Sequence, residues 1–163
     1  MAKPMGYSRT QIWLHWGIAL LILFQVVFGE SMAEAWDAFT ETGAAQMNVL
    51  VWGHIIAGVA ILLFALWRLY LRATRGVPAP IAGQPRVQVI AGEAVHWVLY
   101  AIMIVAPLTG LAAWYGGVLQ AGEVHGTVKP VIIVLVGVHI LAALYHQFIK
   151  KDGLLLRMKR AQD

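Results

Sequence analysis

Two histidines stand fourteen positions apart in the apolar run HGTVKPVIIVLVGVH, which covers residues 125 to 139. An ionisable side chain inside a membrane-spanning segment is costly, and it indicates function by default. Fourteen helical residues turn through about 1400°, about 40° short of four full turns, and rise by roughly 21 Å. His125 and His139 therefore leave nearly the same face of one predicted helix, at two depths.

Two further histidines lie inside other apolar segments. His15 follows the start of the first segment by a few residues, and His54 follows the start of the second. Because successive spans run in opposite directions, His54 can meet His125 near one membrane surface and His15 can meet His139 near the other. Two facing neutral imidazoles suit a bis-histidine haem, in which the protein fills both axial positions of an electron-transferring iron. The spacing therefore predicts two stacked iron sites.

Other interpretations of these histidines remain open. A zinc or copper site would need more than two ligands. A proton relay would more naturally include a buried carboxylate, and the spans contain only Glu93, at an edge. Glycines near the histidines leave room for a flat macrocycle, although close helix packing accounts for each of them as well. These glycines are Gly17, Gly53, Gly58, Gly126 and Gly137.

The composition indicates which kind of secondary-structure element positions these side chains. Of 163 residues, 60% are hydrophobic and only 12% are charged, which indicates a membrane protein. Without cysteine, thiolate sites and iron–sulfur clusters are excluded. We expect one domain over residues 1–163, an all-α, four-transmembrane-helix bundle, with 76–92 as an irregular loop. The four expected spans cover about residues 11–28, 49–70, 93–114 and 126–149.

The basic residues predict the orientation. Eleven of the twelve lie on one side of the expected spans, and the positive-inside rule makes that side cytoplasmic, with both termini there. The opposite loops contain five acidic residues and one lysine, Lys129. The net charge of +4 therefore reflects membrane topology, and we expect no nucleic-acid partner. The eleven residues are Lys3, Arg9, Arg68, Arg72, Arg75, Arg86, Lys150, Lys151, Arg157, Lys159 and Arg160.

Five more residues have candidate roles at the cytoplasmic side. His146 lies seven residues after His139, on the same helix face, and with Tyr145 it is a candidate quinone contact and proton donor at the membrane edge. An interfacial histidine would occupy the same place. Arg68 and Arg72 are candidates to pair with haem propionates, or serve topology alone. A further histidine, His96, is a rival ligand, a propionate or water partner, or an interfacial side chain.

Several sequence segments together resemble the bacterial cytochrome b561 family of di-haem membrane cytochromes. They are YSRTQIWLHW at residues 7–16, the VWGHIIAGVAILLFALWRLYLR segment with His54, EAVHWVLY in the third span, and GVHILAALYHQFIKKDGLLLRM near the end. The resemblance covers nearly the whole chain in order. It implies two b haems, with iron ligands at His15, His54, His125 and His139.

The resemblance also implies electron transfer in the bacterial inner membrane, between a periplasmic-side donor and the quinone pool. Ubiquinone is the expected quinone, and a c-type cytochrome or a dehydrogenase is the expected partner. Some family members are superoxide oxidases, so a stand-alone enzyme that passes electrons from superoxide to ubiquinone is an alternative. A haem-free structural or transport protein is the remote alternative.

Overall fold

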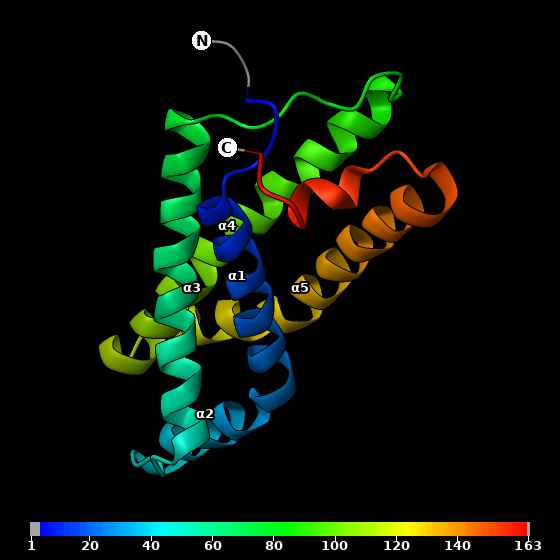
Figure 1. Ribbon diagram of the computed structural model, residues 1–163. Coiled ribbons are helices and arrows are strands. Elements are labelled where there is room, and N and C mark those ends of the chain that lie inside the picture. Colours follow the sequence, from blue (N-terminus) through cyan, green and yellow to red (C-terminus); the bar gives the residue numbers. More distant parts are fainter. Residues whose placement is uncertain (1–3, 163) are drawn as a thin grey trace.

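The computed structural model describes residues 4–162, so Lys3, one of the basic residues counted above, lies outside the described part. No strand occurs among the described residues. Four helices are long and apolar enough to cross a membrane, as predicted: α1 (Arg9–Phe28), α3 (Val49–Thr74), α4 (Arg86–Gly116) and α5 (Leu119–Tyr145), the last prolonged to Lys150 (Figure 1). The chain is therefore an all-α, multi-pass membrane protein.

Local signals fix several helix ends. Ser8 and Gln11 form a reciprocal capping box at the start of α1, in which the Gln11 amide donates to Ser8 Oγ at 3.2 Å and the Ser8 amide to Gln11 Oε1 at 3.0 Å. Asn48 Oδ1 accepts from the first amides of α3. Gly117 ends α4 with a φ of 65°, a left-handed conformation that glycine adopts without a steric cost.

Two details of the predicted organisation are wrong. The segment before α3, expected to belong to the acidic loops opposite the basic side, forms a helix, α2 (Glu30–Thr42). The irregular loop expected over 76–92 ends early, because α4 starts at Arg86 directly after Pro85, whose carbonyl oxygen accepts a first helical hydrogen bond from the Val89 amide at 3.2 Å. With 31 residues α4 is about 46 Å long, so it extends beyond a hydrocarbon core of about 30 Å.

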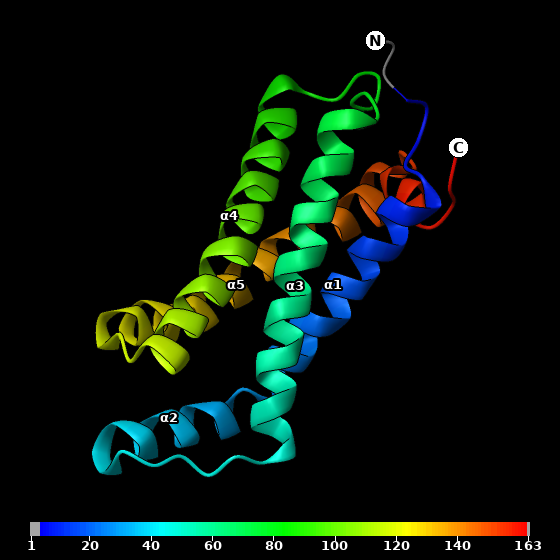
Figure 2. The ribbon, with the colours of Figure 1, turned by 90° about the vertical axis from the view of Figure 1, so that its left-hand side faces the viewer.

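The helices pack in the order α1, α3, α4 and α5, each against the next. Figure 2 shows α3 between α1 and α4, with α2 running across one end of the bundle. The buried core lies where α1, α3 and α4 meet, and α5 contributes no fully buried residue. The core side chains are Ile18, Ile61, Ala65, Tyr100 and Met103.

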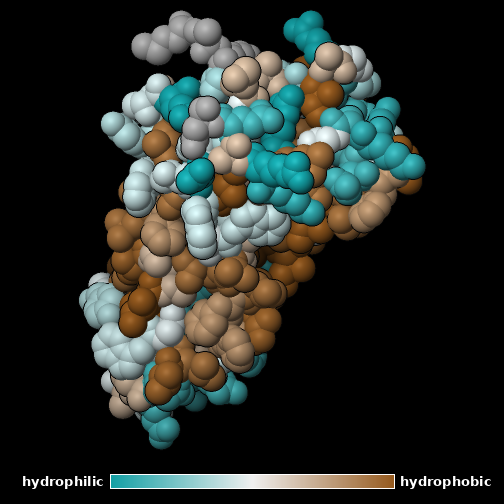
Figure 3. All heavy atoms as spheres, viewed as in Figure 1, coloured by the Kyte–Doolittle hydropathy of each residue, from teal (hydrophilic) through white to brown (hydrophobic). Residues whose placement is uncertain are grey.

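The two ends of the bundle differ in charge. The basic end holds both termini and the 75–85 loop, with a π-helical turn (His146–Lys150) and a 3₁₀ turn (Leu154–Met158) that close the chain (Figure 1). The acidic end holds α2, whose four carboxylates are exposed. Figure 3 shows hydrophobic side chains over the middle of the molecule and hydrophilic ones towards its ends, as expected for a chain surrounded by lipid. The four carboxylates belong to Glu30, Glu34, Asp37 and Glu41.

Candidate functional site: two groups of facing histidines

Near the acidic end, α3 and α5 bring two imidazoles together. The ring centroids of His54 and His125 are 5.9 Å apart, and the ring planes meet at 73°. Each histidine lies in the second turn of its helix, so each ring is positioned close to the same membrane surface. We call these two residues the outer pair.

The ring of His125 is held in one orientation by α4. Its Nδ1 lies 2.8 Å from the Ala106 carbonyl oxygen, and because a carbonyl only accepts, Nδ1 carries the proton. Gly110 makes this approach possible, since a Cβ there would lie 3.0 Å from the His125 ring. With Nδ1 used as a donor, Nε2 keeps a free lone pair, which is the arrangement that metal-binding histidines use.

The ring of His54 is held less completely. Its Nδ1 is buried and has no hydrogen-bond partner among the described residues. The neighbouring Gln25 of α1 donates from Nε2 to the His54 carbonyl oxygen at 2.9 Å, while its own Oε1 is also buried without a partner. Two buried polar atoms without partners therefore belong to residues in direct contact. Native interiors rarely leave buried polar atoms without a hydrogen bond.

Near the basic end, three imidazoles meet instead of two. The ring centroids of His15 and His139 are 6.0 Å apart at 63°, and those of His96 and His139 are 5.2 Å apart at 68°. His96, for which a ligand role is one of the alternatives, has the ring that lies nearer to that of His139. We call these three residues the inner group.

The separations within the two groups fit a metal held between two rings. A metal bound at about 2.0–2.1 Å from each of two opposed imidazole nitrogens separates those nitrogens by about 4 Å and the ring centroids by about 6.4 Å. The observed 5.9 Å and 6.0 Å lie within about 0.5 Å of this spacing, whereas the 5.2 Å between His96 and His139 is too short. The geometry thus favours His15 over His96 as the partner of His139.

The surroundings favour a haem iron over a simple metal ion. Within residues 4–162, no group of three or more His, Cys, Asp or Glu side chains could hold a metal ion, as a zinc site would require. Glu93 is exposed, so it does not supply the buried carboxylate expected of a proton relay. A planar macrocycle supplies the remaining four ligands itself, which makes two facing imidazoles sufficient.

The glycines near the histidines divide into two classes. Those on α1 and α3 face side chains of the other helix, so close helix packing explains them: Gly17 faces Phe64, Gly53 faces Phe24, and Gly58 faces Gln25. On α5, a Cβ at Gly126 or Gly137 would meet no atom within 4 Å. Of these five glycines, Gly126 and Gly137 are the ones that leave such open space, as a flat group beside a histidine would require.

The two arginines proposed as propionate partners contact aromatic side chains of α4. Arg68 Nε donates to the Tyr100 hydroxyl at 3.3 Å, and the Arg72 guanidinium lies 5.0 Å from the centroid of the Trp97 ring. These contacts hold both guanidinium groups near the inner group, on the α4 side of the bundle. Their pairing with propionates stays a prediction.

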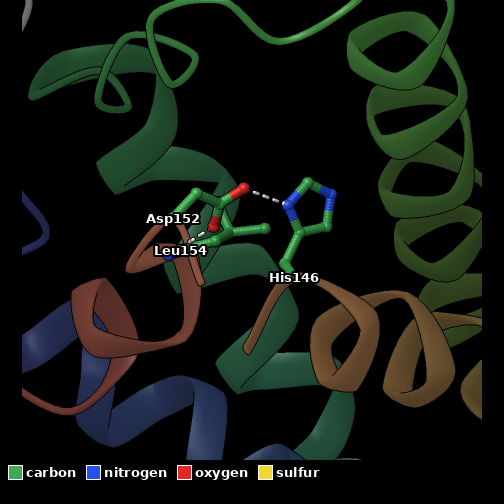
Figure 4. Close-up of polar contacts among 3 residues, drawn as sticks. All are labelled: His146, Asp152 and Leu154. Atoms are coloured by element: carbon green, nitrogen blue, oxygen red, sulfur yellow. Dashed lines mark hydrogen bonds and ion pairs between the residues drawn. The ribbon is translucent and has the colours of Figure 1, made fainter. Parts of the chain in front are cut away.

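The environment of His146 differs from the prediction. It was expected to point to the membrane edge, but it is buried, and its Nδ1 lies 2.5 Å from Asp152 Oδ2 (Figure 4). Burial alone would raise the pKa of Asp152, but the hydrogen bonds that it accepts from His146 and from the Leu154 amide outweigh burial and lower that pKa. Tyr145 remains 42% exposed, with its ring centroid 5.8 Å from that of His146.

The sequence interpretation overlooked several residues that support these groups. Asp152 follows His146 by six positions in the segment KKDG, a short polar stretch after a span. Gln25 is an uncharged polar residue inside an otherwise apolar span, which is itself a signal because such a group needs a partner in lipid. The Ala106 carbonyl and Gly110 carried no signal, since a backbone oxygen and a glycine are common to every helix.

Comparison with known proteins shows which family the whole chain resembles. The sequence profile of a family described as prokaryotic cytochrome b561 matches residues 6–161. Cytochrome b562 from Cereibacter sphaeroides is 39% identical over 160 residues, covering 98% of this chain and 99% of the relative. Probable superoxide oxidase CybB from Yersinia pestis is 29% identical, covering 93% and 94%. Cytochrome b561 homolog 1 from Escherichia coli is 25% identical, covering 93% and 96%.

Proposed function

Because the chain belongs to the prokaryotic cytochrome b561 family, whose members are membrane electron-transfer proteins with b-type haem, we propose that it is a di-haem cytochrome of the bacterial inner membrane. The observation that carries this proposal is the presence of two histidine groups at opposite depths, joined by α5. His54 and His125 would hold one iron, and His15 and His139 the other.

Bound haem iron supplies reversible one-electron chemistry, and the protein supplies its ligation and surroundings. α5 supplies one histidine to the outer pair and one to the inner group, so it would hold haem at both depths between which electrons must pass. His54 with His125, and His15 with His139, would occupy the places on each iron that a substrate could otherwise take. Substrates would therefore exchange electrons at the edges of the two sites, one at each end of the bundle.

We expect quinone reduction at the basic end. His146 and Tyr145 stand one and a half turns or more beyond His139 on the same helix, and quinone reduction needs protons as well as electrons. Tyr145 is 42% exposed and its ring lies beside that of the buried His146, so a quinone that reaches Tyr145 from the bilayer would come close to His146. Ubiquinone is the expected substrate.

Mixing the reduced protein with a short-chain ubiquinone in a stopped-flow instrument tests this placement. His146→Leu should slow haem reoxidation by at least about tenfold, because the proton donor is lost, while both haem absorption spectra persist. Tyr145→Phe should also slow it, and the matched variant Tyr115→Phe, at the acidic end, should leave it unchanged. Unchanged reoxidation in His146→Leu would mean that quinone reacts elsewhere.

The acidic end favours a basic protein as the electron donor. All four carboxylates of α2 are exposed, and the one lysine of this end, Lys129, lies 3.5 Å from Glu30. The ion pair leaves little positive charge there to attract an anion, whereas the carboxylates attract a positively charged surface. A c-type cytochrome or a dehydrogenase with a basic face is therefore the expected periplasmic partner.

Superoxide oxidation is the second candidate function, because the relative from Yersinia pestis is named a probable superoxide oxidase. In that case the chain would be a quinone-linked oxidoreductase in its own right. Haem reduction by superoxide near about 10⁸–10⁹ M⁻¹s⁻¹ would establish this activity. Slow reduction that accelerates with added salt would instead support a repulsive acidic end, because salt screens charge.

A further inference from the structure

A partly open cavity of about 120 Å³, with both polar and apolar lining, lies beside His146 at the basic end. It is bounded by residues 81–85, by the first turn of α4 and by the chain that follows α5. Since a buried water needs about 10–15 Å³ on the same measure, the cavity has room for several. The polar side chains that line it belong to Gln84, Gln88, His146, Lys150 and Asp152.

One lining group has no protein partner. Gln88 Oε1 is buried and accepts no hydrogen bond from the described residues. A buried acceptor beside a roomy polar space is normally satisfied by water. The cavity is therefore suited to hold a short chain of water between the 81–85 loop and His146.

Asp152 joins this cavity to the His146 ring. Its Oδ2 accepts from His146 Nδ1 at 2.5 Å, and its Oδ1 accepts from the Leu154 amide at 3.1 Å, as the dashed lines in Figure 4 show. Both oxygens are thus engaged, which fixes the carboxylate. The Asp152 side chain is 19% exposed and that of His146 only 9%, so the carboxylate stands between the surface and the ring.

The hydrogen bond to Asp152 makes the two ring nitrogens of His146 chemically different. An ionised carboxylate keeps a proton on Nδ1 and stabilises the positive ring that forms when Nε2 is protonated as well. Figure 4 shows the second ring nitrogen pointing away from Asp152. Nε2 is therefore the nitrogen that can exchange a proton with another molecule.

We propose that Asp152 is a positioning residue for proton delivery, which keeps His146 oriented as an acid that is recharged from the cavity. The proposal rests on quinone reduction at His146. Two electrons from the donor at the acidic end and two protons convert a quinone to a quinol. His146 Nε2–H gives one proton to a quinone oxygen and becomes neutral, the cavity water restores it, and bulk water at the lipid edge gives the second proton.

The charged neighbours are few enough for a clean test. Among the residues that line the cavity, Lys150 and Asp152 are the charged ones, and Tyr145 is the titratable residue whose ring contacts His146. The full chain, purified with its bound haem, is reduced and mixed with a short-chain ubiquinone, and haem reoxidation is followed in H₂O and in D₂O. The variants are Asp152→Asn, Asp152→Glu and Asp152→Ala, with Glu93→Gln, at an exposed carboxylate of α4, as the matched control.

We expect Asp152→Asn to reoxidise about tenfold more slowly, with a larger solvent isotope effect, while the haem spectra stay unchanged. Asp152→Glu should recover part of the rate. Added formate, a small carboxylate that the cavity can hold, should accelerate Asp152→Ala but not the control. A merely structural Asp152 would not respond to formate or D₂O in this way.

The outcomes separate the two proposals. If Asp152→Asn and Asp152→Ala keep the rate of the unchanged protein while His146→Leu is slow, the role of Asp152 is wrong and the quinone site stands. The quinone site is wrong if quinone does not reoxidise the unchanged protein, or if His146→Leu is reoxidised as fast as the unchanged protein. In either case the proposed role of Asp152 is wrong as well.

Discussion

The outer pair and the inner group both bring imidazole rings together, but they differ in how completely the structure fixes the candidate ligand rings. In the outer pair, two rings face each other, and His125 is fixed by the Ala106 carbonyl and by the space at Gly110. In the inner group, His139 has two imidazole neighbours, and the nearer one, His96, stands too close to share a metal with it. Protein contacts thus fix the His125 ring of the outer pair, whereas in the inner group only the ring spacing distinguishes His15 from His96.

Removing an outer ligand should have the largest effect. His54→Ala or His125→Ala should abolish the outer haem and leave the inner one, because no third imidazole lies against that pair in the described structure. Haem content and reduced-minus-oxidised spectra measure this. If His15→Ala and His125→Ala removed the same haem, the assigned pairs would be incorrect.

The inner group gives the sharpest contrast with this result. His15→Ala should remove the low-spin signal of the inner haem, while His96→Ala should keep it, because 6.0 Å fits a shared metal and 5.2 Å does not. Electron paramagnetic resonance of the oxidised variants distinguishes the two. Loss of the inner signal in His96→Ala, with retention in His15→Ala, would make His96 the ligand.

A smaller effect should follow from crowding His125. In Gly110→Val, the new Cβ would lie 3.0 Å from the His125 ring. Overpacking of this kind typically lowers the free energy of unfolding by about 1–3 kcal/mol. Outer-haem occupancy should fall while the inner haem persists. Gly92→Val is the matched control in the same helix, since a Cβ at Gly92 meets no atom within 4 Å. Equal losses in both variants would point to helix destabilisation instead.

The smallest effect concerns Gln25. When His54 binds a metal through Nε2, its Nδ1 carries a proton, and Gln25 Oε1 is the buried unpaired acceptor in the neighbouring side chain. Losing a hydrogen bond of about 1 kcal/mol corresponds to about 40 mV for a one-electron couple. Gln25→Leu should therefore shift the outer-haem potential by that order, and the exposed control Gln120→Leu should not. An unchanged potential in Gln25→Leu would leave His54 Nδ1 without this partner.

The sequence was sufficient for the features that follow from periodicity and composition. The four spans and the common face of His125 and His139 depend on helix geometry alone, and the structure brings their rings to His54 and His15. Side-chain contacts could not be predicted in the same way. The bond between His146 and Asp152 forms because the chain turns back after Lys150, and the Ala106 contact depends on the approach of α4 to α5. Both are products of packing between segments.

The extent of α2 and the early start of α4 were missed for a related reason. Glu30–Thr42 has too few apolar residues for a span, so a hydropathy pattern treats it as a connection, although its aromatic side chains pack beside Trp114. The prolines near residue 80 suggested an irregular chain up to residue 92. Pro85 directly precedes the true boundary, and a proline is compatible with a helix start because it interrupts no helical hydrogen bond there.

The central claim is that two facing histidine groups hold two haems in one chain. Haem quantification of the purified protein, combined with electron paramagnetic resonance of its oxidised form, tests it most directly. The account predicts two b haems per chain, both low-spin, because protein imidazoles fill both axial positions of each iron. One haem per chain, or a high-spin five-coordinate signal in the native protein, would contradict it.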